Sequence, residues 1–306
     1  MNSKIFFVNE GAKILSKKRL PAFFSVICLI VFAAMAYFGR RPSREPLFIE
    51  NIHPGVDYYR GSTLFPENTV YHLVEIDLRT AGLEIVATES AEPYKFAAAT
   101  VQSFAETNQT QIAINGNFFW PFYSNHPFSY YPKAGDLVEV NGIAVTNGKI
   151  ENRPEAKWPA LCITDENRAS INGSGRCSSD TMFAVSGNLQ TMKSGKPIDF
   201  PNQDRLPRTI VAVDETGETL WFLIIDGRQG LYSGGATHQF GQELLRQAGA
   251  FESLNLDGGG STTLIVEQDG EQQLMNSAFH TRVVMRQRPV ANHLGIRIPA
   301  ASDVEN

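Results

Sequence analysis

The sequence predicts an α+β protein in which β-dominated mixed sheets accompany a few helices and follow an N-terminal transmembrane helix. Three observations predict this class: many short runs of strand length, Asn-Gly pairs at 141–142 and 147–148 between such runs, and one long apolar segment near the N-terminus. The 306 residues are 42% apolar, which is enough for a sizeable core and excludes wholesale disorder.

The apolar segment at 20–38 contains no charged residue. At about 1.5 Å per residue a helix of this length spans about 28 Å, close to the hydrocarbon thickness of a bilayer. More basic residues precede the segment than follow it closely, which favours a cytoplasmic N-terminus and an exported body. We expect a basic tail at 1–19, an uncleaved membrane anchor at 20–38, a stalk at 39–68 and one folded domain at 69–300.

Two other interpretations of the apolar segment stay open. Ala34-Met35-Ala36 fits the small-x-small cleavage site of a secretory signal peptide, which would release the body from the membrane. A buried core helix is the third interpretation. Both the anchor and the signal peptide export residues 42–306 to the periplasm or the cell exterior.

The charges are unevenly distributed along the chain. The first 41 residues hold seven of the 27 basic residues and one of the 32 acidic residues, so the remainder carries a net charge of −11. Non-specific binding to nucleic acid needs a basic surface, so we expect no nucleic-acid partner. A few local arginines still suffice to bind a small anion.

Two of the three cysteines lie in the expected exported body. Cys28 falls inside the apolar segment, whereas Cys162 and Cys177 form an even pair. An oxidising compartment permits a disulfide between them, and the alternative is two free buried thiols. No histidine lies close enough to these cysteines to predict a zinc site.

The first half of the body alternates short strands with turns. Residues 100–107 form an expected helix with Val101, Phe104 and Ala105 facing inward. Residues 116–135 form an expected aromatic loop. Strands are expected at 71–78, 83–87, 111–115, 137–151 (two or three), 160–163, 168–171 and 182–186.

A strand–helix–strand crossover is expected in the second half. Strands at 208–213 and 219–225 form a hairpin, a helix capped by Thr237 and stopped by Gly249 follows, and a strand at 253–256 comes next. A crossover joins parallel strands, so neighbouring strands would bring Asp226 and Asp257 to the same edge of a sheet. The first hairpin would place Arg208 beside Asp226. A second hairpin at 262–275 would return Asn276 and Ser277 towards Ser261.

Two carboxylates, two arginines and a glycine loop would therefore converge on one edge. Paired carboxylates serve glycoside hydrolysis, and guanidinium groups suit a phosphate. The triple glycine at 258–260 lets the backbone approach a ligand closely. An Asp-Gly after a strand is also an ordinary turn, and an Arg beside an Asp is often only a salt bridge, so the convergence carries the interpretation rather than any single residue.

The segment 255–263, with the letters NLDGGGSTT, resembles the signature of the phosphodiester glycosidase family. Segments at 115–119, 208–209, 226–228, 249–250 and 288–292 agree with the family in order, so the resemblance covers roughly 70–298. Asn117 stands where the family usually has glycine. The Cys-rich appendage and the C-terminal membrane anchor of animal members are absent from this sequence, so the chain resembles a bacterial-type member with an N-terminal anchor.

The resemblance implies cleavage of a sugar-1-phosphate diester at the anomeric carbon, which releases the sugar and a phosphomonoester. Such a substrate belongs to the GlcNAc-1-phosphate type or to a related envelope or exopolysaccharide glycan. The catalytic residues implied are Asp257, Asp226, Arg208 and Arg228. The substrate-binding residues implied are Asn115, Asn117, Phe118, Phe119, Gly258, Gly259, Gly260, Ser261, Thr262, His280 and Asn292. Phe118 and Phe119 are equally consistent with core aromatics.

Two other functions stay open: a non-catalytic glycan-binding module that retains the cleft, and a structural envelope protein. Retention of both carboxylates favours the enzyme, because a binding module needs aromatics but not two acids. No cofactor is expected, since no His-x-x-x-His spacing occurs. A structural calcium bound by loop carboxylates stays open, as do the oligomeric state and the choice between retaining and inverting hydrolysis.

Overall fold

The computed structural model describes residues 19–201 and 204–298 and divides the chain into two compact units, one ending at Arg40 and one beginning at Arg41. The segment predicted as an apolar helix is α1 (Arg19–Phe38). Within the residues that the structure describes, however, no helix is long and apolar enough to cross a membrane, so the transmembrane assignment is not supported. Apart from Arg19, the predicted basic tail lies outside the described residues.

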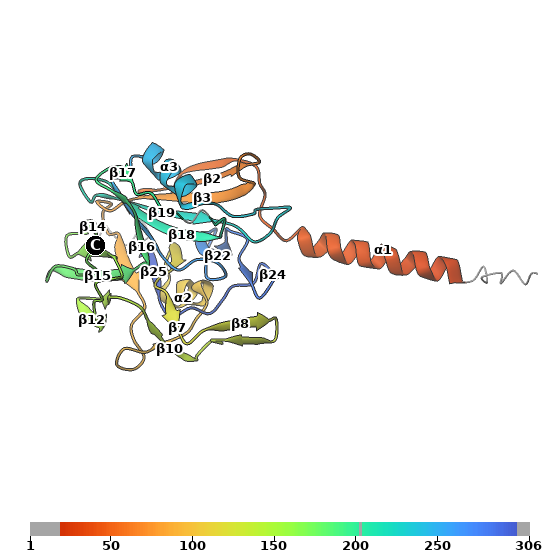
Figure 1. Ribbon diagram of the computed structural model, residues 1–306, viewed down its shortest axis with the longest axis horizontal. Helices are drawn as coiled ribbons and strands as arrows, with labels where there is room; N and C mark the ends of the chain where they lie inside the picture. The colour runs from red at the N-terminus through yellow and green to blue at the C-terminus, as the bar shows by residue number, and fades with distance from the viewer. Residues whose placement is uncertain (1–18, 202–203, 299–306) are drawn as a thin grey trace, which may run out of the picture. The chain divides into compact units, whose positions relative to one another are not determined.

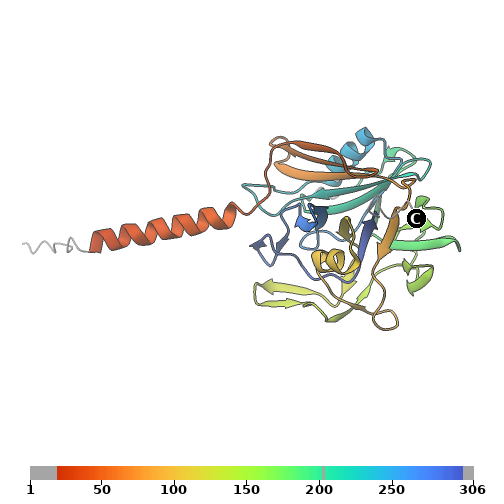
Figure 2. The same cartoon turned by 180° about the vertical axis from the view of Figure 1, so that it is seen from behind.

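The body beginning at Arg41 is dominated by strands, as predicted, and its largest sheet has eight of them (Figures 1 and 2). All neighbouring strands in this sheet are antiparallel. In spatial order they are β1 (Leu47–His53), β2 (Val56–Thr63), β3 (Thr69–Asp77), β19 (Thr219–Ile225), β18 (Arg208–Val213), β20 (Glu252–Asn255), β16 (Leu189–Lys193) and β17 (Lys196–Pro197). The stretch interpreted as a stalk at 39–68 thus contains two strands that the sequence pattern did not reveal.

Both faces of the eight-stranded sheet are covered, which explains the continuous apolar run of β19. Trp221, Leu223 and Ile225 pack in one cluster with residues of α3 (His238–Ala248), the helix predicted by its cap and periodicity. Thr237 caps its start by accepting a hydrogen bond from Phe240 N, and Gly249 ends it at a φ of 99°. Alternate residues of β19 point to the opposite face.

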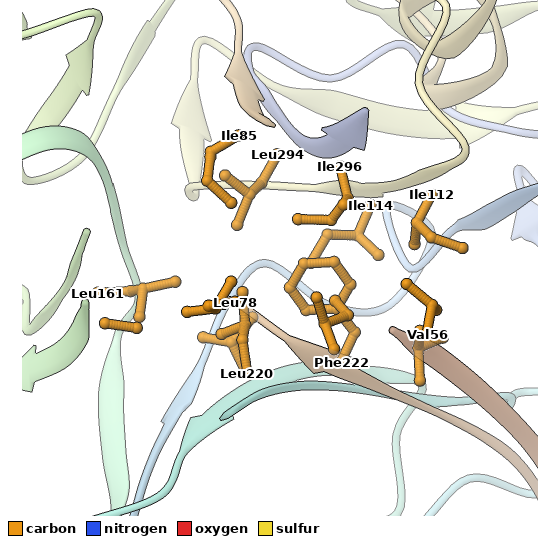
Figure 3. Close-up of a cluster of buried hydrophobic side chains, with 14 of the residues drawn as sticks. Val56, Leu78, Ile85, Ile112, Ile114, Leu161, Leu220, Phe222, Leu294 and Ile296 are labelled. Carbon is orange, nitrogen blue, oxygen red and sulfur yellow. The ribbon is translucent and has the colours of Figure 1, made fainter. Parts of the chain in front are cut away.

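The main core lies between that opposite face and a second, five-stranded sheet. Leu220 and Phe222 of β19 meet Ile112, Ile114 and Leu294 there (Figure 3). The second sheet runs β22 (Glu271–Leu274), β21 (Leu264–Gln268), β6 (Ile112–Asn115), β25 (His293–Arg297) and β4 (Glu84–Ala87). The expected helix is α2 (Val101–Asn108), capped by Thr100, with Val101, Phe104 and Ala105 buried.

Smaller sheets complete the body. Another five-stranded sheet runs β12 (Lys149–Asn152), β11 (Ala144–Thr146), β15 (Thr181–Ser186), β13 (Ala160–Thr164) and β14 (Ala169–Asn172). A three-stranded sheet runs β5 (Phe96–Ala97), β10 (Leu137–Val140) and β7 (Phe119–Trp120). Two hairpins are β8 (Tyr123–His126) with β9 (Ser129–Tyr131) and β23 (Phe279–His280) with β24 (Val283–Val284). The segment expected as an aromatic loop therefore carries β7, β8 and β9.

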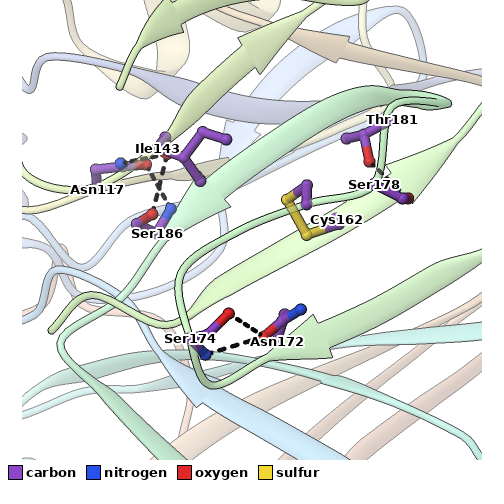
Figure 4. Close-up of a disulfide and its surroundings, with 9 residues drawn as sticks. Asn117, Ile143, Cys162, Asn172, Ser174, Ser178, Thr181 and Ser186 are labelled. Atoms are coloured by element: carbon purple, nitrogen blue, oxygen red, sulfur yellow. Dashed lines mark hydrogen bonds between the residues drawn. A yellow bond between two sulfur atoms is a disulfide. The ribbon is translucent and has the colours of Figure 1, made fainter. Parts of the chain in front are cut away.

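The predicted disulfide joins Cys162 on β13 to Cys177 in the loop before β15 (Figure 4). Cys162 is buried, and Cys177 packs against the same small apolar cluster. The bond closes a sequence separation of 15 residues. The bond ties a polar loop to the buried strand β13.

The crossover was predicted correctly in its elements but not in its pairing. β18 lies between β19 and β20 and is antiparallel to both. The two outer strands therefore run parallel without being neighbours, because the hairpin partner occupies the position between them. Arg208 pairs with Ile225, the residue before Asp226, as the hairpin predicts. The carboxyl ends of β19 and β20 still meet at the edge where β18 begins.

Candidate active site

A cavity of about 790 Å³ opens at this edge of the eight-stranded sheet. The glycine loop 258–260 forms part of its wall. Aromatic side chains in the wall are Phe118, Phe119, Phe122 and Phe200. Charged or titratable groups in the wall are Asp204, Arg208, Arg228, His238, Asp257 and Arg288. The composition suits a ligand with one flat or apolar face and a negative charge.

Asp257 follows β20 and is held from its backbone. Its N–H donates to Gly116 O at 3.2 Å, and its carbonyl accepts a hydrogen bond of 2.7 Å from Asn115 Nδ2. Its carboxylate accepts a hydrogen bond of 2.5 Å from Ser261 Oγ. These contacts fix the direction of the carboxyl group while leaving it in the cavity wall.

Burial gives Asp257 an unusual titration. The side chain is only 8% exposed, and desolvation raises its pKa from 3.8 to about 6. The guanidinium of Arg288 and the Ser261 hydroxyl act in the opposite direction and limit the rise. At neutral pH the carboxylate is therefore mostly ionised, yet it accepts a proton far more readily than an exposed aspartate.

The glycine loop lies directly against two guanidinium groups. A Cβ at Gly259, whose φ is +64°, would fall 2.9 Å from Arg228 Nη2, and a Cβ at Gly260 would fall 2.5 Å from Arg288 Nη2. Only glycine permits this approach without displacing the arginines. The loop thus presents backbone and two positive charges on one wall, an arrangement that suits a phosphate.

Arg288 is fixed by three neighbours. It donates to Ser261 Oγ at 2.9 Å and to His280 Nδ1 at 3.3 Å, and its guanidinium carbon lies 4.3 Å from the ring centre of Phe122. Burial lowers the pKa of Arg288 to about 10, while Asp257 opposes the fall. The side chain stays protonated at neutral pH. Burial lowers the pKa of His280 to about 3, so this imidazole acts as a neutral acceptor.

Arg208 is another charged residue of the cavity wall. Its Nε donates to Ala236 O at 2.7 Å, Nη2 donates to Asp204 O at 2.7 Å and Nη1 donates to His238 Nε2 at 2.9 Å. Because arginine has no acceptor, His238 must be neutral with its proton on Nδ1. Burial and the charge of Arg208 lower the pKa of His238 to about 4.

Asp226 lies behind the cavity rather than in its wall. Its Oδ1 accepts hydrogen bonds from Ser277 N at 2.8 Å and Asn276 Nδ2 at 3.1 Å. Its Oδ2 accepts one from Tyr232 at 3.3 Å and lies 3.5 Å from His72 Nε2. The return of Asn276 and Ser277 is as the second hairpin predicts, but these partners occupy the carboxylate. Asp226 therefore holds the turn that carries Arg228.

Arg228 occupies a constrained backbone position. It has a φ of 60°, and its N–H donates to Gly234 O. At the preceding Gly227 a Cβ would lie 2.7 Å from Pro207 N, so the turn passes too close to its neighbour for a side chain. The three residues of the Asp226-Gly227-Arg228 motif thus have different roles. Asp226 anchors the turn, Gly227 lets the turn pass close to Pro207, and Arg228 reaches the cavity.

The three predicted substrate-binding asparagines are internal connectors and do not line the cavity. Asn115 Oδ1 accepts hydrogen bonds from Thr209 Oγ1 and Thr263 N. Asn117 Oδ1 accepts from Ser186 N at 3.0 Å, and Asn117 Nδ2 donates to Ile143 O (Figure 4). Asn117 Oδ1 also accepts from Asn292 Nδ2 at 3.0 Å. The asparagine at the position where glycine is usual has all its polar atoms paired with the protein.

Most other predicted binding residues either line the cavity or lie behind it in contact with a residue that lines it. Phe118, Phe119 and the three glycines line the cavity as predicted. Ser261 and His280 lie behind it, where both contact Arg288. Thr262 is buried next to them. The sequence interpretation missed Arg288 as a site residue, although it noted the segment 288–292, and it missed His238.

Within residues 19–201 and 204–298, no group of three or more His, Cys, Asp and Glu side chains is arranged to hold a metal ion. At the cavity, His238 accepts a hydrogen bond from Arg208, and the Asp257 carboxylate is connected to Arg288 through the Ser261 hydroxyl. The arrangement can therefore bind a phosphate through guanidinium groups and offer one carboxylate of raised pKa to a reacting centre.

Similar folds occur in solved structures. A hypothetical protein from Synechocystis matches with a TM-score of 0.62 and 13% identity, over 84% of this chain and 64% of that one. The zebrafish N-acetylglucosamine-1-phosphodiester α-N-acetylglucosaminidase catalytic domain, auto-inhibited by its pro-peptide, matches with a TM-score of 0.57 and 16% identity, over 85% and 87% of the two chains. A protein of Burkholderia pseudomallei matches with a TM-score of 0.51 and 14% identity, over 76% and 74%.

These likenesses establish the fold, and this chain spans just under two thirds of the Synechocystis protein. No curated protein sequence matches the chain. A family model, described as phosphodiester glycosidase, matches residues 108–297, which include the glycine loop, Arg208, Arg228, Asp257 and Arg288. The chain therefore belongs to the phosphodiester glycosidase family, hydrolases that act on phosphodiester-linked sugars.

Proposed function

We propose that the cavity hydrolyses a sugar-1-phosphate diester, of the GlcNAc-1-phosphate type or from a related envelope or exopolysaccharide glycan. Water adds to the anomeric carbon, the bond from that carbon to the phosphate oxygen breaks, and the products are the free sugar and a phosphomonoester. The observation that carries the proposal is the placement of Asp257 in the same wall as the Arg228 and Arg288 guanidinium groups.

The arginines would stabilise the leaving group. A phosphodiester carries one negative charge, and the departing phosphomonoester carries more, so the interaction with guanidinium groups strengthens as the bond breaks. Arg228 and Arg288 lie against the glycine loop, and Arg208 lines the same cavity. Because the phosphate is already a good leaving group, the site needs no strong general acid.

Asp257 would act on the sugar side. Ionised, it can take a proton from the attacking water or stabilise positive charge at the anomeric carbon. Its pKa of about 6 lies close to a neutral working pH, which favours proton transfer in either direction. Phe118 and Phe119 supply an apolar wall for a sugar face.

The body would work outside the cytoplasm. The Cys162–Cys177 disulfide supports this placement, because disulfides persist in oxidising compartments such as the periplasm or the cell exterior. Envelope and extracellular glycans are the sugar phosphates available there. The proposed location and the proposed substrate therefore agree.

A substrate panel tests the function. The full chain is incubated with sugar-1-phosphate diesters that differ in the sugar, and free sugar and phosphomonoester are quantified. We expect equimolar release from at least one member. Asp257→Asn should lower kcat by a factor of about 10² to 10⁴.

The matched control for this variant is Asp180→Asn, at an exposed position that lines no cavity wall, which should retain full activity. Both variants are checked for folding by circular dichroism. Equal activity of the two variants would contradict the role of Asp257. Glycan binding by the wild type without release of sugar from any diester would contradict hydrolysis and favour a binding module.

A further inference from the structure

A second, smaller cavity adjoins the proposed active site. It has a volume of about 410 Å³ and shares Ser124, Arg228 and Arg288 with the larger cavity. The two arginines proposed to hold the phosphate therefore belong to both walls. A phosphodiester held there has one ester arm towards each cavity, because its two substituents leave the phosphorus in different directions.

The remaining wall of the smaller cavity is basic and polar. It is formed by Asn125 of β8 and by Phe279, Thr281 and Arg282 around the β23–β24 hairpin. With the two shared arginines it holds three guanidinium groups, and no acidic side chain lines it. Arg282 is exposed, and among the described residues no hydrogen bond or ion pair is recorded for its guanidinium. The wall thus presents a positive charge available to a ligand.

The backbone that carries Arg282 adopts an uncommon conformation. Thr281 and Arg282 form the turn between β23 and β24 with φ values of 52° and 64°. This type of turn favours Asn and Gly, and a left-handed φ is unfavourable for a β-branched threonine. Such positions persist where the surroundings hold them, and they gather at functional sites.

Packing around the turn supplies that support. Arg286 donates from Nη1 to Thr281 Oγ1 at 3.1 Å and to Pro127 O at 2.8 Å. Pro127 lies in the loop between β8 and β9, so Arg286 joins this hairpin to the turn of the β23–β24 hairpin, and residues of both hairpins line the smaller cavity. The chain therefore fixes a turn with two left-handed residues, one of which is a cationic side chain at the cavity.

We propose that the smaller cavity receives the alcohol side of the phosphodiester, and that Arg282 binds a second anionic group carried by that alcohol. The substrate class is then a sugar-1-phosphate diester whose alcohol part bears a further phosphate or carboxylate. The sugar occupies the larger cavity, next to Asp257 and the phenylalanines. This assignment rests on the proposed hydrolysis and specifies its substrate.

Matched substrates test the assignment. One sugar-1-phosphate is esterified to glycerol, to glycerol 3-phosphate or to glyceric acid, which distinguishes a neutral alcohol from a phosphate and from a carboxylate. We expect the kcat/KM of the wild type to be about tenfold higher for one of the anionic esters than for the glycerol ester. This is the effect of one charge-assisted hydrogen bond.

Variants at Arg282 separate charge from conformation. Arg282→Gly removes the charge but keeps the left-handed φ, and should abolish the preference by lowering kcat/KM for the favoured anionic ester to about that for the glycerol ester. Arg282→Lys should retain part of the preference. The control is Arg176→Ala, at an exposed position that lines neither cavity, which should change nothing. An unchanged preference in Arg282→Gly would overturn the assignment, as would a wild type without preference.

A binding measurement separates this proposal from the hydrolysis itself. If the wild type releases no sugar from any ester, hydrolysis is contradicted, and calorimetric titration with glycerol 1,3-bisphosphate decides the smaller cavity. About tenfold weaker binding to Arg282→Gly than to Arg176→Ala would support an anion site at Arg282. Equal binding to both variants would overturn it.

Discussion

The Ser261 hydroxyl donates a hydrogen bond of 2.5 Å to the Asp257 carboxylate. The same hydroxyl accepts a hydrogen bond from Arg288, so a neutral side chain connects the proposed catalytic carboxylate to a guanidinium group. The connection favours the ionised form of Asp257 against the burial that opposes it. Its removal should therefore change the titration of the site.

Ser261→Ala should move the acidic limb of the pH profile upward. In the wild type kcat/KM should rise tenfold per pH unit below about pH 6 and level off above, as Asp257 loses its proton. Without the hydrogen bond the pKa of Asp257 rises further, so the limb should shift by about one unit. Profiles of the variant and of Ser179→Ala, an exposed control, provide the measurement. Superimposable pH profiles would contradict the effect of the Ser261 hydrogen bond on the pKa of Asp257.

Asp257→Asn should stabilise the fold at neutral pH. The folded pKa of about 6 exceeds the ordinary value of 3.8, so the folded chain binds more protons than the unfolded chain between these values. The free energy of unfolding therefore falls as the pH rises from about 4 to 6, by about 3 kcal/mol in total. The variant lacks this loss, so its Tm should exceed that of the wild type by about 6 °C at pH 7.5 and by little at pH 4.

Asp226→Asn provides the contrast for that experiment. The Asp226 carboxylate accepts hydrogen bonds from Ser277, Asn276 and Tyr232, and an amide would place an N–H group against one of these donors. Stability at pH 7.5 should fall by about 2 kcal/mol. Thermal unfolding of both variants at the two pH values checks the prediction. A pH-independent Tm difference for Asp257→Asn would show that its carboxylate is not desolvated.

Gly260→Ala should impair catalysis more than folding. The added Cβ would lie 2.5 Å from Arg288 Nη2, the end of a long side chain that can move away. Folding then loses little, but the guanidinium leaves its place beside the phosphate, and kcat/KM should fall by a factor of about 10². Gly230→Ala is the control, since its Cβ would have open space around it and its φ lies outside the left-handed region. Equal kcat/KM in the two variants would place Arg288 outside the reaction.

His238 should position Arg208 without transferring protons. Its pKa of about 4 keeps it neutral above pH 5, and its Nε2 accepts from Arg208. His238→Gln keeps an acceptor and should retain most activity with an unchanged pH profile. His238→Ala frees the guanidinium and should raise KM by about tenfold. Loss of a pH limb in both variants would instead identify His238 as a titrating catalytic group.

Local signals in the sequence point to the glycine loop and Asp257, and the structure places both in the cavity wall. A triple glycine flanked by Asp and Ser after a strand is hard to explain by a turn alone. The cap at Thr237 and the stop at Gly249 are also local signals, and both are confirmed. The hairpin of β18 and β19 likewise places Arg208 correctly from sequence neighbours.

Other features depend on distant contacts that a sequence pattern does not contain. Asp226 and Asp257 both end a strand and follow the same pattern, but the return of Asn276 and Ser277 supplies Asp226 with internal partners. Arg288 reaches the cavity only because the glycine loop leaves room for it. The position of β18 between its neighbours follows from the pairing of β18 with β20, which a crossover pattern does not specify.

Reduction of the disulfide should destabilise the body without changing the site. Cys162 and Cys177 lie in a cluster of the β13 sheet, and neither lines the active-site cavity. Closing a separation of 15 residues restricts the unfolded chain and contributes about 3 kcal/mol. The double variant Cys162→Ala/Cys177→Ala should therefore unfold at a Tm lower by about 6 °C, with kcat unchanged below the transition. Thermal unfolding with and without reductant checks this, because reductant should lower the Tm of the wild type alone. A wild type insensitive to reductant would contradict the predicted contribution of the bond.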